Sequence, residues 1–600
     1  MLFLIILVSS LYAQNITIYI NNVLNTSNPD GSQNSPYTSF EEALNKNISL
    51  NINSKKPIVK FQSTGKPYLM GMSWPITGNS IGDNDLTLTS DYPNFLNQSL
   101  DCSQIPAIII SEDLFIMNTN TLKFQVSNLN ILLSPRNTTL FGFKLSAQEQ
   151  LNLEMSNICA SWEEPLDKIS LGLVSSRSSN ASTAKFQNIY INGIFWNEEF
   201  GKIIDLNLPD KSQVSIDSME VNVAVSAKQI LPREGLFSFN TNNLLYIAES
   251  ITIHKVTIKG SISIEEPSDE IPSLFYLENF ANAVVQDFSF RDLELSSLSL
   301  YGLRVMNGLS LSLKNIDALG IYSKNNNPAD FFRLIMIESP IKELALSMDS
   351  VSVIGSTNTG ILEVNSFISE LNITQLLVQN SDLTNDEYLI SLRAYEKNPS
   401  PQTIKNLYIT DFQVINSTLF GRVLEVSGLT PPPNEIINNP TIPPYQLNMY
   451  NVKLLNNIIT YPTKSAKPDT NVFLVSNVAY LLQNSIFQGN KWENVSVFGN
   501  SYYAANMYLI ENKFIGEDFK TATFIITNQT TIFDDQKNVT QLYRLLLIQN
   551  CIFRDITYYY KGNTALSIAS FIHNMAPFLL IRGNIFYNLQ MTLGDRKSVV

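Results

Sequence analysis

The sequence predicts an all-β protein: a right-handed, single-stranded parallel β-helix (a solenoid) with an N-terminal capping helix. Three observations support this fold. A short motif recurs in which Asn or Asp interrupts a run of Ile, Leu, Val and Phe, most clearly in 371–380, 407–416 and 447–456. The segments between its copies are short and strand-like. Amphipathic helical periodicity with caps is nearly absent, and repetition along a chain is typical of stacked folds.

The polar residue of the motif returns with a mean spacing of about 33 residues. We place it at Asn128, Asn157, Asn188, Asp217, Glu249, Asp287, Asn315, Asp349, Gln375, Asp411, Asn451, Asn484, Asn512, Asn550 and Asn584. A second polar turn often follows a few residues later. Strand, polar corner, strand, polar corner and longer loop describe one β-helix coil. Inward Asn side chains would hydrogen-bond from coil to coil in a ladder.

Three other folds compete with this interpretation. Leucine-rich repeats are shorter, and their Asn stands at a different distance from the last apolar position. A propeller would carry Trp-Asp or Gly-rich signatures every 40–50 residues or so. A tandem of β-sandwiches would need hairpin turns, but the chain has only 24 Gly and few Asn-Gly pairs. The parallel β-helix therefore fits the pattern best.

Residues 1–13 are expected to be a secretory signal, because an apolar run is followed by small residues near a cleavage point. A buried first strand is the alternative. We expect residues 14–120 to form the N-terminal cap and first coils, and residues 121–600 to form the repeats with an open C-terminal end. An open end exposes core and backbone, so we expect the array to continue beyond residue 600 or to pair with another molecule. Membrane attachment is expected only through a longer product or a partner, since no run reaches about 18 apolar residues.

Composition points to an extracellular or cell-surface glycoprotein made through the secretory pathway. The formal net charge is -13, which disfavours nucleic acid and anionic membranes as partners. The chain has three cysteines; Cys102 and Cys159 can form a disulfide, or all three including Cys551 can be buried thiols. The Asn-x-Ser/Thr acceptor sites are Asn15, Asn25, Asn47, Asn97, Asn137, Asn180, Asn372, Asn416, Asn494, Asn528 and Asn538.

Residues 28–44 carry a second signal. An Asp-Gly turn is followed by Pro-Tyr, then by Phe40 and an Ala-Leu pair. Thr38 with Glu41 and Ser39 with Glu42 can each form a capping box at a helix start. This stretch resembles the opening of pectin-lyase-like right-handed β-helix proteins. The resemblance implies that fold, with a short helix covering the first coil. More loosely, the Asn-rich coils resemble the β-helical ectodomains of protist surface proteins.

The catalytic motifs of polygalacturonase-like members of that superfamily are not matched. The two histidines, His254 and His573, lack flanking glycines, and no cluster of carboxylates with an Arg base is evident. Asp534 and Asp535 form an isolated acidic pair, for which a solvated turn is favoured over a metal site. The resemblance therefore implies the fold and leaves the activity open.

The best carboxylate candidates are two acidic pairs that each follow a tryptophan. They are Glu163 and Glu164 after Trp162, and Glu198 and Glu199 after Trp196. On adjacent coils they would lie about 4.8 Å apart, which suits acid–base work on a sugar or a Ca²⁺ site. The alternative is two solvated loops with a partly buried Trp each.

Aromatic runs at Tyr502, Tyr503 and 558–560 fit either a sugar platform or structural ring stacks, and we favour the stacks. His254 is expected to be a strand residue without a catalytic role. We assign no catalytic residue, metal ligand or cofactor-binding residue, since no nucleotide fingerprint, zinc spacing or Ser/His/Asp context is present.

These observations predict a secreted or cell-surface β-helix protein with a structural, adhesive or glycan-binding role, no evident catalytic site and no cofactor. Its partner would be an extracellular protein or glycan. The alternative is a polysaccharide-acting lyase or hydrolase of the pectin-lyase fold, so the question of catalysis stays open. Three or more converging carboxylates with an Arg or Lys on one face would favour the enzyme, and a smooth Asn, Ser and Thr face would favour binding.

Overall fold

The computed structural model shows a chain built almost entirely of β-strands. It describes residues 15–24, 28–43, 56–70, 83–92, 101–110, 114–133, 140–162, 171–200, 202–230, 235–240, 247–264, 271–296, 299–323, 331–383, 388–395, 405–428, 445–461, 471–476, 478–501, 506–520, 523–527, 532–533, 539–540, 545–560, 572–574, 578–593 and 596–599. Within these ranges the only helix is α2 (Phe40–Ala43). No helix in the described ranges is long and apolar enough to cross a membrane.

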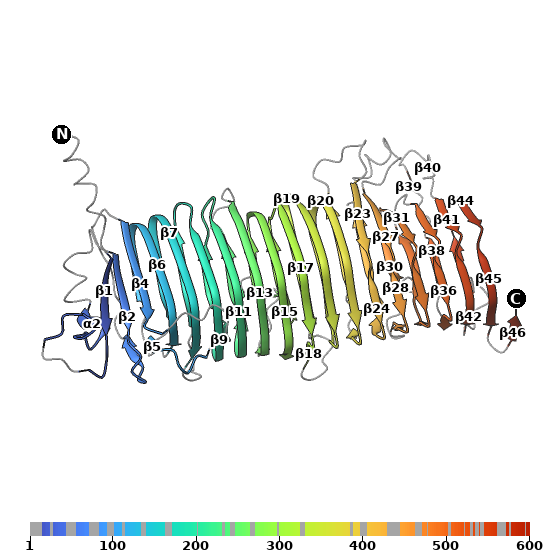
Figure 1. Ribbon diagram of the computed structural model, residues 1–600. Coiled ribbons are helices and arrows are strands. Elements are labelled where there is room, and N and C mark those ends of the chain that lie inside the picture. Colours follow the sequence, from blue (N-terminus) through green and yellow to red (C-terminus); the bar gives the residue numbers. More distant parts are fainter. Residues whose placement is uncertain are drawn as a thin grey trace. The chain divides into compact units, whose positions relative to one another are not determined.

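The chain divides into two compact units. The first comprises Met1–Ser289 with Ser296–Leu298, and the second comprises Phe290–Leu295 with Ser299–Val600. Strand β15 (Phe280–Ser296) contributes to both. Within each unit successive strands lie side by side (Figure 1).

The strands of the first unit cover its described residues almost without interruption. They are β1 (Asn15–Ile20), β2 (Lys56–Phe61), β3 (Tyr68–Met70), β4 (Asp83–Ser90), β5 (Ala107–Ile110), β6 (Leu114–Leu133), β7 (Leu140–Trp162), β8 (Leu171–Ser178), β9 (Thr183–Phe200), β10 (Ile204–Asn207), β11 (Gln213–Ile230), β12 (Phe237–Asn240), β13 (Ala248–Ile264) and β14 (Ser273–Glu278).

In the second unit β19 and β20 are the longest strands, with 24 and 21 residues, and β42 and β45, with 9 residues each, are the longest of those that follow. They are β16 (Ser299–Met306), β17 (Ser310–Leu319), β18 (Tyr322–Ser323), β19 (Phe331–Ile354), β20 (Thr359–Gln379), β21 (Asp382–Leu383), β22 (Ile390–Tyr395), β23 (Lys405–Thr410), β24 (Gln413–Ile415), β25 (Thr418–Phe420), β26 (Leu424–Gly428), β27 (Tyr445–Tyr450), β28 (Lys453–Leu455), β29 (Ile458–Thr460), β30 (Asn471–Ser476), β31 (Ala479–Gln483), β32 (Ile486–Gln488), β33 (Lys491–Glu493), β34 (Ser496–Ser501), β35 (Met507–Ile510), β36 (Lys513–Ile515), β37 (Asp518–Lys520), β38 (Thr523–Thr527), β39 (Ile532–Phe533), β40 (Val539–Thr540), β41 (Leu545–Gln549), β42 (Ile552–Tyr560), β43 (Ile572–Asn574), β44 (Phe578–Arg582), β45 (Ile585–Leu593) and β46 (Arg596–Val599).

Pairing between successive coils is parallel in both units. In the first unit Phe186 of β9 aligns with Ile216 of β11, which aligns with Ile253 of β13. In the second unit Leu407 of β23 aligns with Leu447 of β27. Parallel pairs need a long crossover, and the remainder of each coil supplies it. The predicted parallel β-helix is therefore confirmed, and its right-handed sense stays a prediction.

The core lies between the inward columns of the coils. Strands alternate one side chain inward and one outward, so in β23 Leu407 is fully buried while Tyr408 is 40% exposed. Farther along the second unit, the rings of Phe487, Phe514 and Phe553 stack from coil to coil with centroids 4.8 and 5.0 Å apart. Burial of such columns stabilises the fold by about 25 cal/mol per Å² of apolar area.

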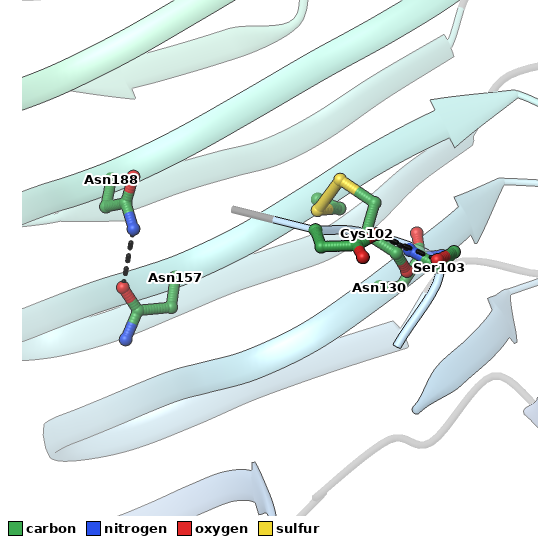
Figure 2. The surroundings of a disulfide bond; sticks show 7 residues. Cys102, Ser103, Asn130, Asn157 and Asn188 are labelled. Carbon is green, nitrogen blue, oxygen red and sulfur yellow. Dashed lines mark hydrogen bonds between the residues drawn. A yellow bond between two sulfur atoms is a disulfide. The ribbon is translucent and has the colours of Figure 1, made fainter. Parts of the chain in front are cut away.

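Left-handed residues turn the chain at a polar corner of many coils. At ten of the predicted positions φ lies between 52 and 57°: Asn128, Asn157, Asn188, Asp287, Asn315, Gln375, Asp411, Asn451, Asn484 and Asn550. Asn and Asp adopt this conformation at lower cost than most residues. Asn157 Nδ2 donates to Asn128 Oδ1 at 2.9 Å. Asn188 Nδ2 donates to Asn157 Oδ1 at 2.8 Å, the bond drawn in Figure 2. The predicted Asn ladder is confirmed at these corners.

The corner falls on a different residue at the other five predicted positions. The left-handed residues there are Ser218, Lys255, Ser350, Glu511 and Gly583 in place of Asp217, Glu249, Asp349, Asn512 and Asn584. The physical reason is that the inward apolar columns fix the corner, and packing holds even Lys or Glu in this conformation. Asn512 instead points inward, where its Oδ1 accepts from Ser485 N at 2.9 Å and its Nδ2 donates to Leu482 O at 2.9 Å.

A second buried polar ladder runs through the later coils. Ser417 N donates to Asn457 Oδ1 at 3.0 Å, Asn457 N donates to Asn490 Oδ1 at 3.0 Å, and Asn490 N donates to Glu517 Oε1 at 3.3 Å. These side chains are at most 3% exposed. The ladder satisfies corner N–H groups that would otherwise be buried without a partner.

Helix α2 begins at the second of the two predicted capping boxes, Ser39 with Glu42. Ser39 Oγ accepts from Glu42 N at 3.1 Å, and the Glu42 carboxylate accepts from Thr38 N at 3.0 Å. The reciprocal bond therefore reaches one residue farther back than in the standard box. Phe40 is 4% exposed, and its ring stacks on Phe61 of β2 with centroids 6.3 Å apart.

The cysteines resolve into one disulfide and one thiol. Cys102 and Cys159 are bonded across a sequence separation of 57 residues (Figure 2). Asn130 Nδ2 donates to Cys102 O at 3.2 Å. Cys551 is a buried thiol, and burial raises its pKa.

Near the C-terminal end of the described chain, β46 turns back and pairs antiparallel with β45, which the sequence did not indicate.

Candidate functional site

The carboxylates predicted from the sequence have no described side chains. Glu163 and Glu164 lie outside the described residues; Glu198 and Glu199 belong to β9, but their side chains are outside the description. Trp162 is 8% exposed and lies against Gly193, where a Cβ would come within 2.4 Å of the indole. The indole therefore fills the space above a glycine.

The remaining candidates divide in the same way. Asp534, Asp535, Tyr502 and Tyr503 lie outside the described residues. Tyr558 is 3% exposed with its ring 6.4 Å from that of Phe519, so for this residue the structural interpretation is confirmed. In the described chain no group of three or more His, Cys, Asp or Glu side chains is placed to hold a metal ion.

His254 links three coils of the first unit. Its Nδ1 lies 3.0 Å from Asp217 Oδ1 and its Nε2 lies 3.0 Å from Asp287 Oδ2. The two carboxylates fix the orientation of the ring. The sequence placed His254 on a strand and did not reveal these partners.

A different group of side chains converges on one face of the second unit, at a bend in each coil. Two consecutive apolar residues point into the core there, in the pairs Leu334–Ile335, Ile361–Leu362, Leu389–Ile390 and Val423–Leu424, each 0% exposed. Ile361 N and Leu362 N both donate to Leu389 O, at 2.8 and 3.1 Å, which marks the bend. Because two neighbours point inward, the residues before and after each pair face outward.

The outward residues at this bend form three columns, aligned by the pairing of β16, β19, β20, β22 and β26. Tyr388 and Arg422 stand two residues before the first paired residues Ile390 and Leu424. The first holds Tyr301, Arg333, Gly360, Tyr388 and Arg422; the second holds Arg304, Met336, Glu363, Ser391 and Glu425; the third holds Met306, Glu338, Asn365, Arg393 and Ser427. We call the charged and tyrosine members the arginine–tyrosine cluster: Tyr301, Arg304, Arg333, Glu338, Glu363, Tyr388, Arg393, Arg422 and Glu425.

Two ion pairs of the cluster are largely buried. Arg304 Nε and Nη2 donate to Glu338 Oε2 at 3.0 and 2.6 Å, and the Arg304 side chain is 9% exposed. Arg333 is 1% exposed, with its Nε 3.1 Å from Glu363 Oε2. Removal of one member of such a pair leaves an uncompensated buried charge, at a cost of about 3–5 kcal/mol.

Two further arginines are more open. The Arg393 side chain is 46% exposed, and its Nη2 lies 3.8 Å from Glu425 Oε2, longer than a hydrogen bond. Arg422 Nη1 donates to the Tyr388 hydroxyl in a short contact. Ser391 Oγ reaches Glu425 Oε2 at 3.5 Å. Arg393 therefore has an exposed guanidinium, and its contact with Glu425 is too long to be a hydrogen bond.

Aromatic rings support three of the arginines. The guanidinium carbon lies 5.5 Å from the ring centroid for Arg304 on Tyr301, 4.8 Å for Arg333 on Phe331 and 4.7 Å for Arg422 on Tyr388. Such stacking restrains the planar guanidinium while its N–H edge stays available for carboxylates.

Both tyrosines keep their protons at neutral pH. Burial raises the pKa of Tyr301 to about 12, helped by the charge of Glu363. Burial also raises the pKa of Tyr388 far above its usual value, helped by the charge of Glu425. The hydroxyls can therefore donate hydrogen bonds but are poor general bases.

Gly360 makes room for this arrangement. A Cβ at Gly360 would lie 2.9 Å from the Phe331 ring, 3.0 Å from Tyr388 O and 3.5 Å from the Arg333 guanidinium carbon. A side chain there would force the Phe331–Arg333 stack outward. The glycine is thus a packing requirement of the cluster.

The cluster is not apparent from the sequence, because its members form neither acidic pairs nor catalytic motifs along the chain. A usable signal does exist: a polar or aromatic residue, two apolar residues and a second polar residue. It occurs at 388–391 and 422–425, where the outer residues are Tyr388 with Ser391 and Arg422 with Glu425.

No protein-family model matches the chain, and no curated protein matches it. Three solved structures are similar to it at low scores. They are the catalytic domain of a GH87 alpha-1,3-glucanase in complex with tetrasaccharides (11% identity, 81% of this chain, 65% of that chain, TM-score 0.24), the A-module of the Azotobacter vinelandii mannuronan C-5 epimerase AlgE6 (10%, 91%, 93%, 0.17) and the PL6 family alginate lyase AlyGC (8%, 96%, 89%, 0.18). This chain thus spans under two thirds of the glucanase domain. At these TM-scores the likeness carries no argument about activity.

Proposed function

We propose that this chain is a secreted or cell-surface β-helix protein of a non-catalytic pectin-lyase-like type. It has a structural or adhesive role and contacts its partner through the arginine–tyrosine cluster. The observation that carries the proposal is the pairing of charges: Glu338, Glu363 and Glu425 each face an arginine of the cluster. Acid–base catalysis needs a carboxyl group positioned to exchange a proton with substrate, whereas paired charges suit recognition.

Two observations support export. A disulfide joins Cys102 and Cys159, and disulfides persist mainly in oxidising compartments. Among the predicted acceptor sites, Asn180, Asn372 and Asn416 are exposed in the folded chain. Both fit a glycoprotein of the secretory pathway.

The N-terminal helix fits the proposed family type. Phe40 and Ala43 of α2 are buried, and Phe40 packs on the core ring of Phe61. We infer that α2 covers the open edge of the first coil, which would otherwise expose strand groups to aggregation.

The decisive test is turnover of acidic and neutral polysaccharides. Purified protein is incubated with polygalacturonate, alginate and related polymers, and unsaturated products and new reducing ends are followed. We expect no turnover. Activity that is lost in Glu363→Gln or Glu425→Gln, but retained in Glu493→Gln on another face, would overturn the proposal. Variants Glu163→Gln and Glu198→Gln test the carboxylates chosen from sequence in the same assay.

A polysaccharide-acting enzyme is the second candidate, and one observation favours it. The cluster brings three glutamates and four arginines to one face, which is the combination expected of a catalytic β-helix. The raised pKa values of Tyr301 and Tyr388 count against a tyrosine base in such an enzyme. The turnover assay separates the two candidates.

A further inference from the structure

We propose that the arginine–tyrosine cluster docks an acidic segment of a partner protein, with Arg393 as its main contact. This inference rests on the proposed binding function and names the chemistry of the partner. The described cluster holds four arginines and three glutamates, a net charge of +1, within a chain of net charge -13. A positive site on a chain that is acidic overall attracts a local cluster of carboxylates.

Arg393 is the residue able to change partners. Its Nη2 is 3.8 Å from Glu425 Oε2, and the side chain is 46% exposed. By contrast, Arg333 is 1% exposed and Arg304 makes two contacts of 3.0 Å or less with Glu338. An incoming carboxylate can therefore form a forked pair with Arg393 without disrupting the buried pairs.

Asn365 lies next to Arg393 in the third column. Asn365 aligns with Arg393 on the next coil. Its Nδ2 donates to Glu363 Oε1 at 3.4 Å, while its Oδ1 is buried without a hydrogen-bond partner in the described chain. Because this oxygen is buried, an incoming peptide contacts the column through its side-chain carboxylates, at Arg393.

Ring geometry favours a protein segment over a sugar chain. The rings of Tyr301, Phe331 and Tyr388 already carry a guanidinium on one face. Sugars bind best to a free aromatic face, whereas arginines and tyrosines packed together are typical of protein–protein contact centres.

The test uses the full chain and three probes: a fluorescein-labelled hexaglutamate peptide, a hexaglutamine peptide and hexagalacturonate. Binding of the labelled hexaglutamate is followed by fluorescence anisotropy. The unlabelled probes are tested as competitors of that complex. We expect hexaglutamate to bind and hexaglutamine not to bind. Arg393→Gln should weaken hexaglutamate binding by about tenfold. Added salt should weaken the wild-type complex, because exposed charges are screened.

Arg554→Gln is the matched control. Arg554 is 51% exposed and lies 3.3 Å from Asp555, outside the cluster. It should leave binding unchanged, and Arg393→Lys, which keeps charge but loses the fork, should fall between wild type and Arg393→Gln. Thermal unfolding checks that the variants fold. We expect them to fold, because the Arg393 side chain is exposed.

Three outcomes would overturn the inference: no hexaglutamate binding, equal binding of hexaglutamine, or equal losses in Arg393→Gln and Arg554→Gln. Tighter, Arg393-dependent binding of hexagalacturonate would replace the acidic protein segment with a glycan. None of these results changes the outcome of the turnover assay, so failure of the inference is distinguishable from failure of the proposed function.

Discussion

Glu517 is a buried acid at the end of a polar ladder, and its replacement gives a sharp test of the fold. The side chain is 1% exposed, and burial raises its pKa to about 8. Three donors oppose this shift: Asn490 N at 3.3 Å, Asn490 Nδ2 at 3.1 Å and Trp492 Nε1 in a short contact. Burial is the larger effect, so the carboxyl group stays mostly neutral at pH 7 in the folded chain.

The sign of the pH dependence follows from the two pKa values. In the unfolded chain the group titrates near its ordinary value of 4.5. Between that pH and about 8 the unfolded state binds fewer protons than the folded state. The stability that Glu517 contributes is therefore complete below pH 4.5 and is lost as the pH rises toward 8.

The magnitude is about 1.4 kcal/mol for each pH unit in this window, or about 4 kcal/mol between pH 5 and pH 8. The Gln side chain of Glu517→Gln cannot titrate. From pH 5 to pH 8 the free energy of unfolding of the wild type should therefore fall relative to that of the variant by this amount. A constant offset from altered hydrogen bonds does not affect this slope. Guanidinium unfolding followed by far-UV circular dichroism measures it at several pH values.

Glu493→Gln is the matched control for Glu517→Gln. Glu493 is 41% exposed and lies 2.9 Å from Lys520, an exposed pair that contributes little to stability. Its replacement should change the free energy of unfolding by less than about 1 kcal/mol. A difference between wild type and Glu517→Gln that stays constant from pH 5 to pH 8 would refute the reasoning, because it would mean that the three donors hold Glu517 ionised.

Three further changes have defined outcomes. Tyr480 is fully buried, and its hydroxyl lacks a hydrogen-bond partner in the described chain, so Tyr480→Phe should raise the free energy of unfolding by about 1 kcal/mol. The control Tyr408→Phe, at an exposed site, should leave it unchanged. A destabilised Tyr480→Phe would mean that the hydroxyl does have a partner. Phe514→Ala removes a ring from the central stack and should cost about 3–5 kcal/mol, measured by denaturant unfolding; a cost under about 1 kcal/mol would contradict the core described above. Protein secreted from a glycosylating host should carry a glycan on exposed Asn416 but not on Asn494, because the Asn494 amide donates to Tyr461 O at 3.4 Å. Peptide mass mapping measures the occupancy of both sites. Full occupancy of Asn494 would argue against this packing.

Much of the fold followed from local chemistry. Asn451 and Asn484 were recognisable as corners because few other residues adopt the left-handed backbone at low cost. Ser218 and Glu511 were not recognisable, because packing of the adjacent inward residues imposed the corner there. A one-residue error of this kind reverses which side chains point inward, so corner positions need the three-dimensional stack.

The candidate site was beyond the reach of sequence reasoning for a related reason. Arg333 and Glu363 are 30 residues apart, and only the register of successive coils brings them to 3.1 Å. The lengths of the intervening loops set that register, and they follow no repeat.

By itself, the sequence determined the stacked β-helix, the polar corners and the capping box of α2, because each depends on backbone preferences and strand alternation within a few residues. Only the tertiary structure decided the Cys102–Cys159 pairing, the burial of Glu517 and the convergence of the arginine–tyrosine cluster. These features join residues on different coils. Their distances and burial are set by how the coils stack, and no short stretch of the chain encodes that.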